Sequence, residues 1–188
     1  MSKLVIFIVI QFLSLRLYSQ TASITTTASI TTTSSITTTV KLSDVKNSET
    51  SIPFLGEKVV VIFYVDPDVQ DLTNPLSDAL EAEKFPLDKF AVIGIANCKD
   101  TWLPNAVIRM KARHKQERYP RSLILLDYEH ILSKQWDLGE CNNKLLSIVI
   151  GKDLKIKYLK KLSSIDESRQ SIPDFLETIK KELKQIHS

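Results

Sequence analysis

The stretch VVVIFYV at residues 59–65 is a continuous apolar run, and a second run, FAVIGIAN, follows it at residues 90–97. Both runs are rich in β-branched residues and have the length of a strand. They are nearly free of polar residues, as is typical of a parallel sheet that is covered on both faces. Between them, Asn74 and Pro75 indicate the start of a helix. The three segments together predict a right-handed β-α-β unit.

The remaining segments complete the pattern of one domain. In chain order, they predict a helix from Pro104 and Asn105, a strand over 123–126, a short helix over 131–136, strands over 145–150 and 155–159, and a last helix from Ser171. The turn at residues 151–153 has the composition of a hairpin, and Ser171 to Asp174 resembles a capping box. This order predicts an α/β fold, a thioredoxin-like three-layer sandwich in which helices flank a mixed sheet.

Short motifs recur in a definite order along residues 57–185. They are the strand at 59–64, Asn74-Pro75-Leu76, KFPLDK at 84–89, Asn97 with Asp100 and Trp102, YPRS at 119–122, Leu126-Asp127, Trp136-Asp137-Leu138 and Lys152-Asp153. In this order and spacing the chain resembles the YtfJ family of exported bacterial proteins. The resemblance implies a thioredoxin-like fold and the periplasm, and it transfers no catalytic residue, because the family carries no established reaction. The chain departs from the family pattern at Leu154, where a glycine is common, and in its two cysteines.

The loop after the first core strand is where a redox thioredoxin carries its Cys-x-x-Cys pair. Here the loop reads DPDVQD at residues 66–71, and Asp68 and Asp71 stand at the spacing of the two cysteines. A carboxylate can neither attack a disulfide nor resolve a mixed one. The cis-proline of redox thioredoxins is also missing from residues 143–145. We therefore expect no disulfide exchange here, and the two aspartates are either turn and cap residues or part of a metal or acid–base site.

Cys98 and Cys141 are the only cysteines of the chain. Cys98 follows the second core strand and Cys141 precedes the hairpin, so both are expected at the same edge of the sheet. The first core strand is predicted to lie between them, whereas a disulfide needs Cα atoms within about 7 Å. Three interpretations stay open: two free thiols, a structural disulfide and a redox dithiol.

Asn97, Asp100 and Trp102 stand at the carboxyl end of a predicted parallel strand, where open α/β sheets bind ligands. They are expected either to hold a polar ligand or peptide, or to close the loop, with the tryptophan packed beneath it. With Asp66, Asp68 and Asp71 they form the candidate binding edge. We define the binding edge as residues 66–71, 97–102 and 141–145.

The charge pattern gives no support for nucleic-acid binding. The chain has 25 basic and 22 acidic residues. Lys3 and Arg16 account for two of the basic ones, so residues 41–188 are nearly neutral. The lysines after Lys152 alternate with acidic residues, as on a solvated surface, whereas a nucleic-acid binder shows a basic face.

No cofactor or metal is expected. The three histidines, His114, His130 and His187, form neither a His-x-His nor a His-x3-His pair, and each is predicted to be a surface residue. The four glycines form no phosphate-binding loop. Residues 1–188 therefore offer no recognisable site for a prosthetic group.

The N-terminal segment has the pattern of an export signal. Lys3 and the apolar run at residues 4–13 predict a signal peptide over residues 1–19, after whose removal no stable membrane span is expected. A Thr/Ser-rich repeat of six residues then predicts a disordered spacer over residues 20–50, which is alternatively an O-glycosylated stalk. Residues 51–188 are expected to form the thioredoxin-like domain of a periplasmic or secreted protein.

Three functions remain open on these observations. The first is a non-catalytic module that binds an unknown partner protein or small ligand at the binding edge. The second is an atypical thiol-disulfide oxidoreductase or redox sensor that uses Cys98 and Cys141. The third is a structural protein displayed at the cell surface on the Thr/Ser-rich stalk.

Overall fold

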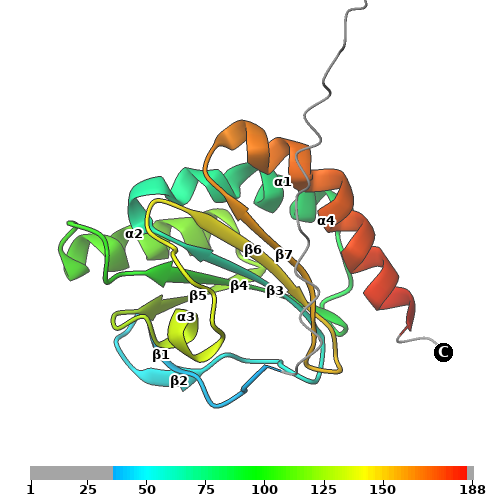
Figure 1. Ribbon diagram of the computed structural model, residues 1–188, viewed down its shortest axis with the longest axis horizontal. Helices are drawn as coiled ribbons and strands as arrows, with labels where there is room; N and C mark the ends of the chain where they lie inside the picture. The colour runs from blue at the N-terminus through cyan, green and yellow to red at the C-terminus, as the bar shows by residue number, and fades with distance from the viewer. Residues whose placement is uncertain (1–35, 186–188) are drawn as a thin grey trace, which may run out of the picture.

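The computed structural model describes residues 36–185, which form one mixed seven-stranded sheet with helices on both faces (Figure 1). The strands lie in the order β2-β1-β5-β4-β3-β6-β7. Their bounds are β1 Lys41–Asp44, β2 Glu49–Ser51, β3 Val59–Val65, β4 Phe90–Asn97, β5 Ser122–Asp127, β6 Leu145–Ile150 and β7 Ile156–Leu162. The helices are the 3-10 helix η1 Pro67–Thr73, α1 Asn74–Glu83, α2 Asn105–Arg118, α3 Ile131–Gln135 and α4 Ile165–Gln185.

Strand β3 is the centre of the sheet, as its apolar sequence predicts. It pairs in parallel with β4 and antiparallel with β6, and all seven of its residues are buried. Its side chains alternate between two cores, because successive residues of a strand point to opposite faces. Val60, Ile62 and Tyr64 pack on the side of α3, whereas Val61 and Phe63 pack under α1 and α4.

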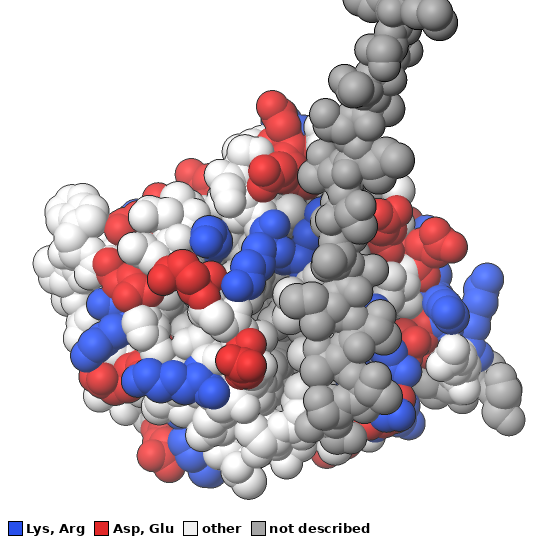
Figure 2. Space-filling model, in the orientation of Figure 1, with Lys and Arg blue, Asp and Glu red and all other residues white. Residues whose placement is uncertain are grey.

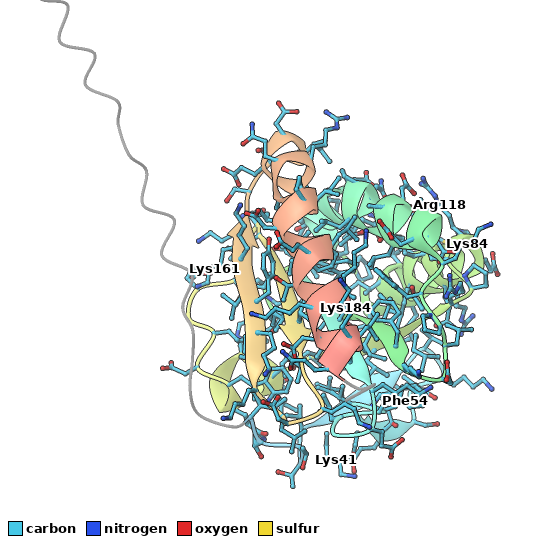
Figure 3. All side chains as sticks on the ribbon, turned by 90° about the vertical axis from the view of Figure 1, so that its right-hand side faces the viewer. Lys41, Phe54, Lys84, Arg118, Lys161 and Lys184 are labelled. Carbon is cyan, nitrogen blue, oxygen red and sulfur yellow. The ribbon has the colours of Figure 1, made fainter. Side chains whose placement is uncertain are left out.

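The helices are divided unequally between the two faces. Helices α1, α2 and α4 cover one face, and α3 lies on the other (Figure 1). Figure 3 shows α4 lying along the sheet, with Lys184 near its C-terminal end. Phe175 and Ile179 of α4 are completely buried against the sheet. The three-layer thioredoxin-like sandwich is therefore confirmed.

The start of the last helix was predicted wrongly. Helix α4 begins at Ile165, well before Ser171, and β7 extends to Leu162. The reason is a second capping sequence: the Ser164 hydroxyl accepts from the Glu167 N–H at 3.1 Å, and Glu167 accepts from the Ser163 N–H at 2.6 Å. Ser171 instead lies buried inside the helix.

The predicted spacer over residues 20–50 is also wrong in its last part. Residues 41–44 form β1, which pairs antiparallel with both β2 and β5. Val40 and Leu42 are buried in the core on the side of α3, since the strand alternation turns them inward. The ordered domain therefore begins before residue 51. The predicted signal peptide and most of the repeat lie outside the described residues.

Two further features bear on the surface. Leu154, in the β6–β7 turn, has a φ of 60°. Glycine adopts this left-handed conformation without strain, which agrees with the glycine that is common at this position of the family pattern.

Figure 2 shows acidic and basic side chains interspersed over the displayed face. Over residues 36–185 no helix has the length and apolar character needed to cross a bilayer.

Candidate functional site

Asp66 joins two loops of the binding edge. Its side chain is fully buried at the end of β3. Oδ1 accepts from the Asp68 N–H at 2.9 Å and caps η1, while Oδ2 accepts from the Asn143 N–H at 2.9 Å. Its own N–H donates to the Lys144 carbonyl at 3.2 Å. The backbone around Asn143, where a redox thioredoxin would place its cis-proline, is thus tied to a carboxylate.

The two aspartates at the Cys-x-x-Cys spacing have separate partners. Asp68 is exposed and accepts from the Thr101 hydroxyl at 2.9 Å, which links η1 to the loop after β4. Asp71 accepts from the side chain of Asn74 at 3.2 Å, at the junction with α1. Asp68 therefore belongs with the loop at residues 98–104, whereas Asp71 stabilises the start of a helix.

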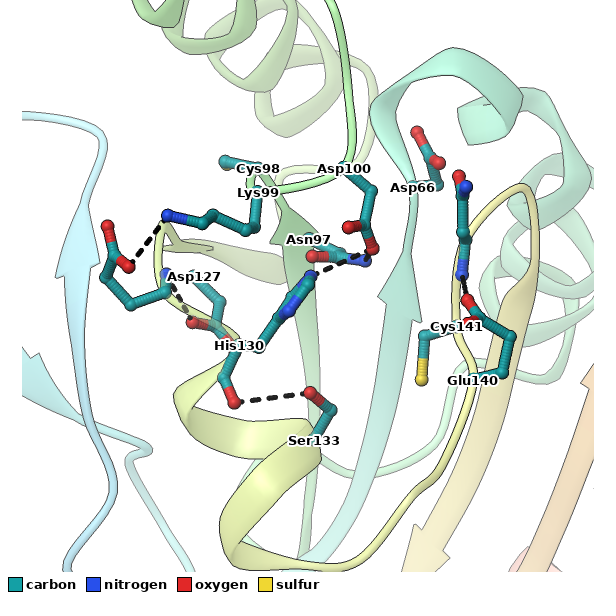
Figure 4. A network of polar contacts seen from close by, with 12 residues as sticks. Asp66, Asn97, Cys98, Lys99, Asp100, Asp127, His130, Ser133, Glu140 and Cys141 are labelled. Atoms are coloured by element: carbon teal, nitrogen blue, oxygen red, sulfur yellow. Dashed lines mark hydrogen bonds and ion pairs between the residues drawn. The ribbon is translucent and has the colours of Figure 1, made fainter.

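Asn97, Asp100 and His130 form a hydrogen-bonded cluster (Figure 4). The Asn97 Nδ2 donates to Asp100 Oδ2 at 2.8 Å, and the His130 Nε2 lies 2.8 Å from the same oxygen. The Asp100 and His130 side chains are 24% and 26% exposed, so solvent still reaches the pair. The Asn97 Oδ1 is buried and has no hydrogen-bond partner among the described residues. The cluster therefore presents the Asp100 carboxylate to solvent, while the Asn97 amide oxygen stays buried and unpaired within the described residues.

His130, expected as a surface residue without a ligand role, is instead paired with Asp100. His130 follows β5, whose parallel neighbour β4 ends at Asn97. The carboxyl ends of parallel neighbours meet at one edge of the sheet, and that rule would have brought His130 beside Asp100. The signal was thus present in the strand order rather than in any spacing of histidines.

Asp127 holds the histidine loop in place. Its side chain is fully buried and accepts from the N–H groups of Ile131 and Leu132 at 2.8 and 3.0 Å. Both N–H groups lie in the first turn of α3, where they have no partner within the helix. Asp127 also accepts from the Tyr64 hydroxyl at 3.2 Å. The carboxylate therefore fixes the loop that carries His130 to the central strand.

A polar pocket of about 220 Å³ opens beside the Asp100–His130 pair. It is lined by Asp100, His130, Ser133, Gly139, Glu140, Cys141 and Asn142. These residues come from the loop after β4, from the start of α3 and from the loop before β6. Because two of them are carboxylates and none is basic apart from the histidine, the pocket suits a group that donates hydrogen bonds or is positively charged.

The two cysteines are free and buried, so of the three interpretations the structure shows two free thiols and no structural disulfide. Strand β3 lies between β4, which precedes Cys98, and β6, which follows Cys141, as predicted. Figure 4 shows the two residues on opposite sides of His130. Burial raises the pKa of the Cys98 thiol to about 12 and that of the Cys141 thiol to about 11. Both thiols are therefore protonated at neutral pH and are poor nucleophiles.

Trp102 extends into solvent from the loop between β4 and α2. Its exposed fraction is 82%, so the expectation that it packs beneath the loop is wrong. The neighbouring Thr101 is held by Asp68, as described above. Trp136, in contrast, packs on the core near α3 and donates its indole N–H to the Thr37 carbonyl at 3.0 Å.

Within the part of the chain that the structure describes, no three His, Cys, Asp or Glu side chains gather as metal ligands. The binding edge, which the structure extends by His130, Ser133, Gly139 and Glu140, thus consists of an acidic pocket, an exposed tryptophan and two buried thiols. Asp66, Asp68, Asn97, Asp100 and His130 come together there, while Asp71 lies apart.

Similarity to solved structures agrees with the fold. An uncharacterised thioredoxin-like protein from Porphyromonas gingivalis has a TM-score of 0.56 and 10% identity, covering 80% of this chain and 92% of that one. A candidate electron transfer protein from Aquifex aeolicus VF5 has a TM-score of 0.53 and 15% identity, covering 77% and 96%. The thioredoxin domain of a thiol-disulfide oxidoreductase from Bacteroides vulgatus has a TM-score of 0.50 and 14% identity, covering 76% and 97%. At these identities the similarity shows the fold alone.

Sequence comparison identifies the family. A comparison with curated proteins found no match to this chain. The family model described as "Bacterial protein of unknown function (YtfJ_HI0045)" matches residues 29–182, which include every strand and nearly all of α4. Because the match spans most of the sequence, the chain belongs to the YtfJ family of bacterial proteins of unknown function.

Proposed function

We propose that this protein is an exported, non-catalytic thioredoxin-like domain that binds a partner protein at its binding edge. The observation that carries the proposal is the exposure of Trp102, two residues after Asp100 of the polar pocket. This edge of the sheet is the one at which a redox thioredoxin engages its substrates. Here the scaffold is intact and the reactive pair is missing.

An exposed tryptophan on a loop is costly in water and valuable in an interface. Trp102 leaves 82% of its surface in solvent, whereas tryptophan is normally well buried. Tryptophan is among the residues most enriched at the energetic centre of protein interfaces. The hydrogen bond from Thr101 to Asp68 holds the preceding residue, so the loop is partly organised before a partner arrives.

The acidic pocket indicates which chemical group the partner carries near the residue that contacts Trp102. Asp100 and Glu140 supply carboxylate oxygens to the pocket. Lys or Arg side chains and N–H groups complement such oxygens. The partner is therefore a protein with an apolar spot for the tryptophan and a basic group for the pocket.

The oxidoreductase alternative finds less support in the site. A redox pair needs a thiolate within reach of a second sulfur. The two thiols of this chain are buried, have raised pKa values and flank β3 on different sides. The protein is accordingly proposed as a binder rather than a thiol exchanger.

Site-specific photo-crosslinking tests the binding proposal. A photoreactive phenylalanine analogue replaces Trp102 in cells of the source bacterium, and the same analogue replaces Leu87 as the control. Leu87 is 52% exposed and lies before β4, at the opposite end of that strand. We expect a discrete protein adduct from position 102 only, weakened by Asp100→Asn. Equal adducts at both positions, or none at 102, would contradict the proposal.

A thiol-exchange assay separates the two functions. Reduction of insulin by the purified protein is measured for the wild type, Cys98→Ser and Cys141→Ser. We expect the same background rate for all three proteins. Turnover that disappears in Cys98→Ser would refute the non-catalytic proposal and favour the oxidoreductase.

The proposed export is supported by the signal pattern of residues 1–19 and by the periplasmic location that the family resemblance implies. Mass spectrometry of the mature N-terminus from a periplasmic fraction tests it. We expect cleavage near residue 19 and an unmodified Thr/Ser-rich segment. A ladder of hexose masses on that segment would instead favour the surface stalk.

A further inference from the structure

A second cavity lies on the helix-rich face of the sheet, between α2 and strands β3 to β5. Its volume is about 70 Å³, and it shares no lining residue with the Asp100–His130 pocket. The apolar lining comes mainly from Phe63, Val65, Val92, Ala96, Ile108, Ala112 and Ile124. Gly94 opens the space further, because its position in β4 carries no side chain.

The size of the cavity limits its occupant. An engineered apolar cavity that binds benzene measures about 150 Å³, so the space of about 70 Å³ is roughly half as large. It encloses a short branched alkyl group or part of an aromatic ring, and the rest of the ligand lies toward the open side of the cavity. A long acyl chain does not fit.

The charged groups of the lining all have the same sign. They are Lys111 and Lys115, and no Asp or Glu lines the cavity. Lys115 donates to the Asn74 side chain and lies 5.1 Å from the centre of the Tyr119 ring, and within residues 36–185 it has no ion pair. Burial lowers its pKa to about 8, although Asp71 and Asp78 act in the opposite direction. Its ammonium group is thus poorly compensated.

From this geometry we infer that the cavity binds a small hydrophobic carboxylate. The apolar part of the ligand enters between α2 and the sheet, beside Gly94. The carboxylate accepts hydrogen bonds from the Lys115 ammonium, with Lys111 adding a second positive charge. Pro67 and Gln70 of the binding edge also line this cavity, but no residue of the Asp100–His130 pocket does, so the inference does not rest on the partner protein proposed above.

Nuclear magnetic resonance titration of the full chain tests this site. The ¹⁵N-labelled protein is titrated with phenylacetate and, as the neutral match, with phenylacetamide. We expect shifts in the amides of β4 and α2, and at least about tenfold tighter binding of phenylacetate. Absence of shifts at ~10 mM ligand, equal affinities, or shifts confined to residues 98–102 and 130–142 would each overturn the inference.

Two variants test the positive charge of Lys115 and the space beside Gly94 separately. Lys115→Met is expected to weaken phenylacetate about tenfold and to leave phenylacetamide unchanged, whereas Lys152→Met, in the exposed hairpin turn, changes neither. Gly94→Val fills the cavity and is expected to weaken both compounds at least about tenfold. If this variant does not fold, Gly94→Ala replaces it, since a Cβ there meets Ile124 at an ordinary 3.5 Å. Unchanged phenylacetate binding in Lys115→Met would refute the site.

Discussion

Asp127 is the buried carboxylate on which the loop of His130 depends. It accepts the hydroxyl of Tyr64 and three backbone N–H groups, from Glu129, Ile131 and Leu132. Four donors on one side chain satisfy a carboxylate that would otherwise be costly to bury. Asp127, at the end of β5, therefore fixes the position of the loop that carries His130.

Replacing Asp127 tests this role. Asp127→Ala leaves buried donors without a partner, so we expect a loss of about 3 kcal/mol in the free energy of unfolding. Asp127→Asn, which keeps an acceptor, is expected to lose about half as much. Urea denaturation measures both, with Asp88→Ala as the exposed control. A loss no larger than that of the control would show that Asp127 does not organise the loop.

The two thiols are expected to react slowly in the folded protein. With a pKa of about 12, Cys98 holds roughly a thousandth of the thiolate of an ordinary cysteine at pH 8. A thiol with a raised folded pKa ionises first in the unfolded chain, so its contribution to stability is lost as the pH rises above about 9. Alkylation rates of the two thiols, with and without denaturant, measure the slow reaction of the folded protein. Two fast thiols in the native protein would contradict the burial.

Lys115 has the opposite pH dependence. Its folded pKa of about 8 lies below the ordinary 10.5, so the unfolded chain binds more protons between these values. The Lys115 contribution therefore makes stability rise with pH between about 8 and 10.5. We expect Lys115→Met to flatten this part of the pH profile of urea unfolding. A profile parallel to that of the wild type would exclude the effect.

At the scale of elements, α4 shows why a helix start is hard to predict. Two sequences of the form Ser-x-x-acid precede its apolar stripe, at Ser164 to Glu167 and at Ser171 to Asp174. The second contains Pro173, which favours a first turn, and was therefore expected to be the cap. The helix begins at the first, because burial of Ser168 and packing of Ile165 on the core stabilise the additional turns.

The cap of α4 can be tested directly. Ser164→Ala removes the acceptor for the Glu167 N–H, and we expect a loss of about 1 kcal/mol in the free energy of unfolding. Thr178→Ala, within the same helix, serves as the control, because its hydroxyl bonds only to the Asp174 carbonyl of its own helix. Equal losses in the two variants would argue against the capping box.

At the scale of the whole molecule, the N-terminal strands extend the domain beyond its apolar centre. β1 and β2 add to the sheet next to β5, and Leu42 is 3% exposed in the core. Leu42→Ala is therefore expected to cost about 2–3 kcal/mol of stability, while Lys41→Ala, which faces solvent, costs almost nothing. Calorimetric or urea unfolding compares the two. Equal stability would place the domain boundary after β1.

The binding edge also forms only in the folded molecule as a whole. It is assembled from the ends of β3, β4 and β5 and from the loop before β6, segments that are far apart in the chain. Asp66 ties two of these loops together, and Asp127 ties a third to β3. Their partners are backbone N–H groups, which every residue type carries, so no residue pattern predicts the contacts.

The sequence alone determined the central β-α-β unit, the thioredoxin-like order of elements and the absence of a Cys-x-x-Cys pair. These follow from local properties, namely the apolar period, β-branched composition, caps and residue identity. Only the tertiary structure decided that Trp102 lies in solvent, that the two thiols are buried and that Lys115 stands at an apolar cavity. Each of these depends on which loops and helices the folded sheet brings together, and contacts between distant segments leave no periodic mark in the chain.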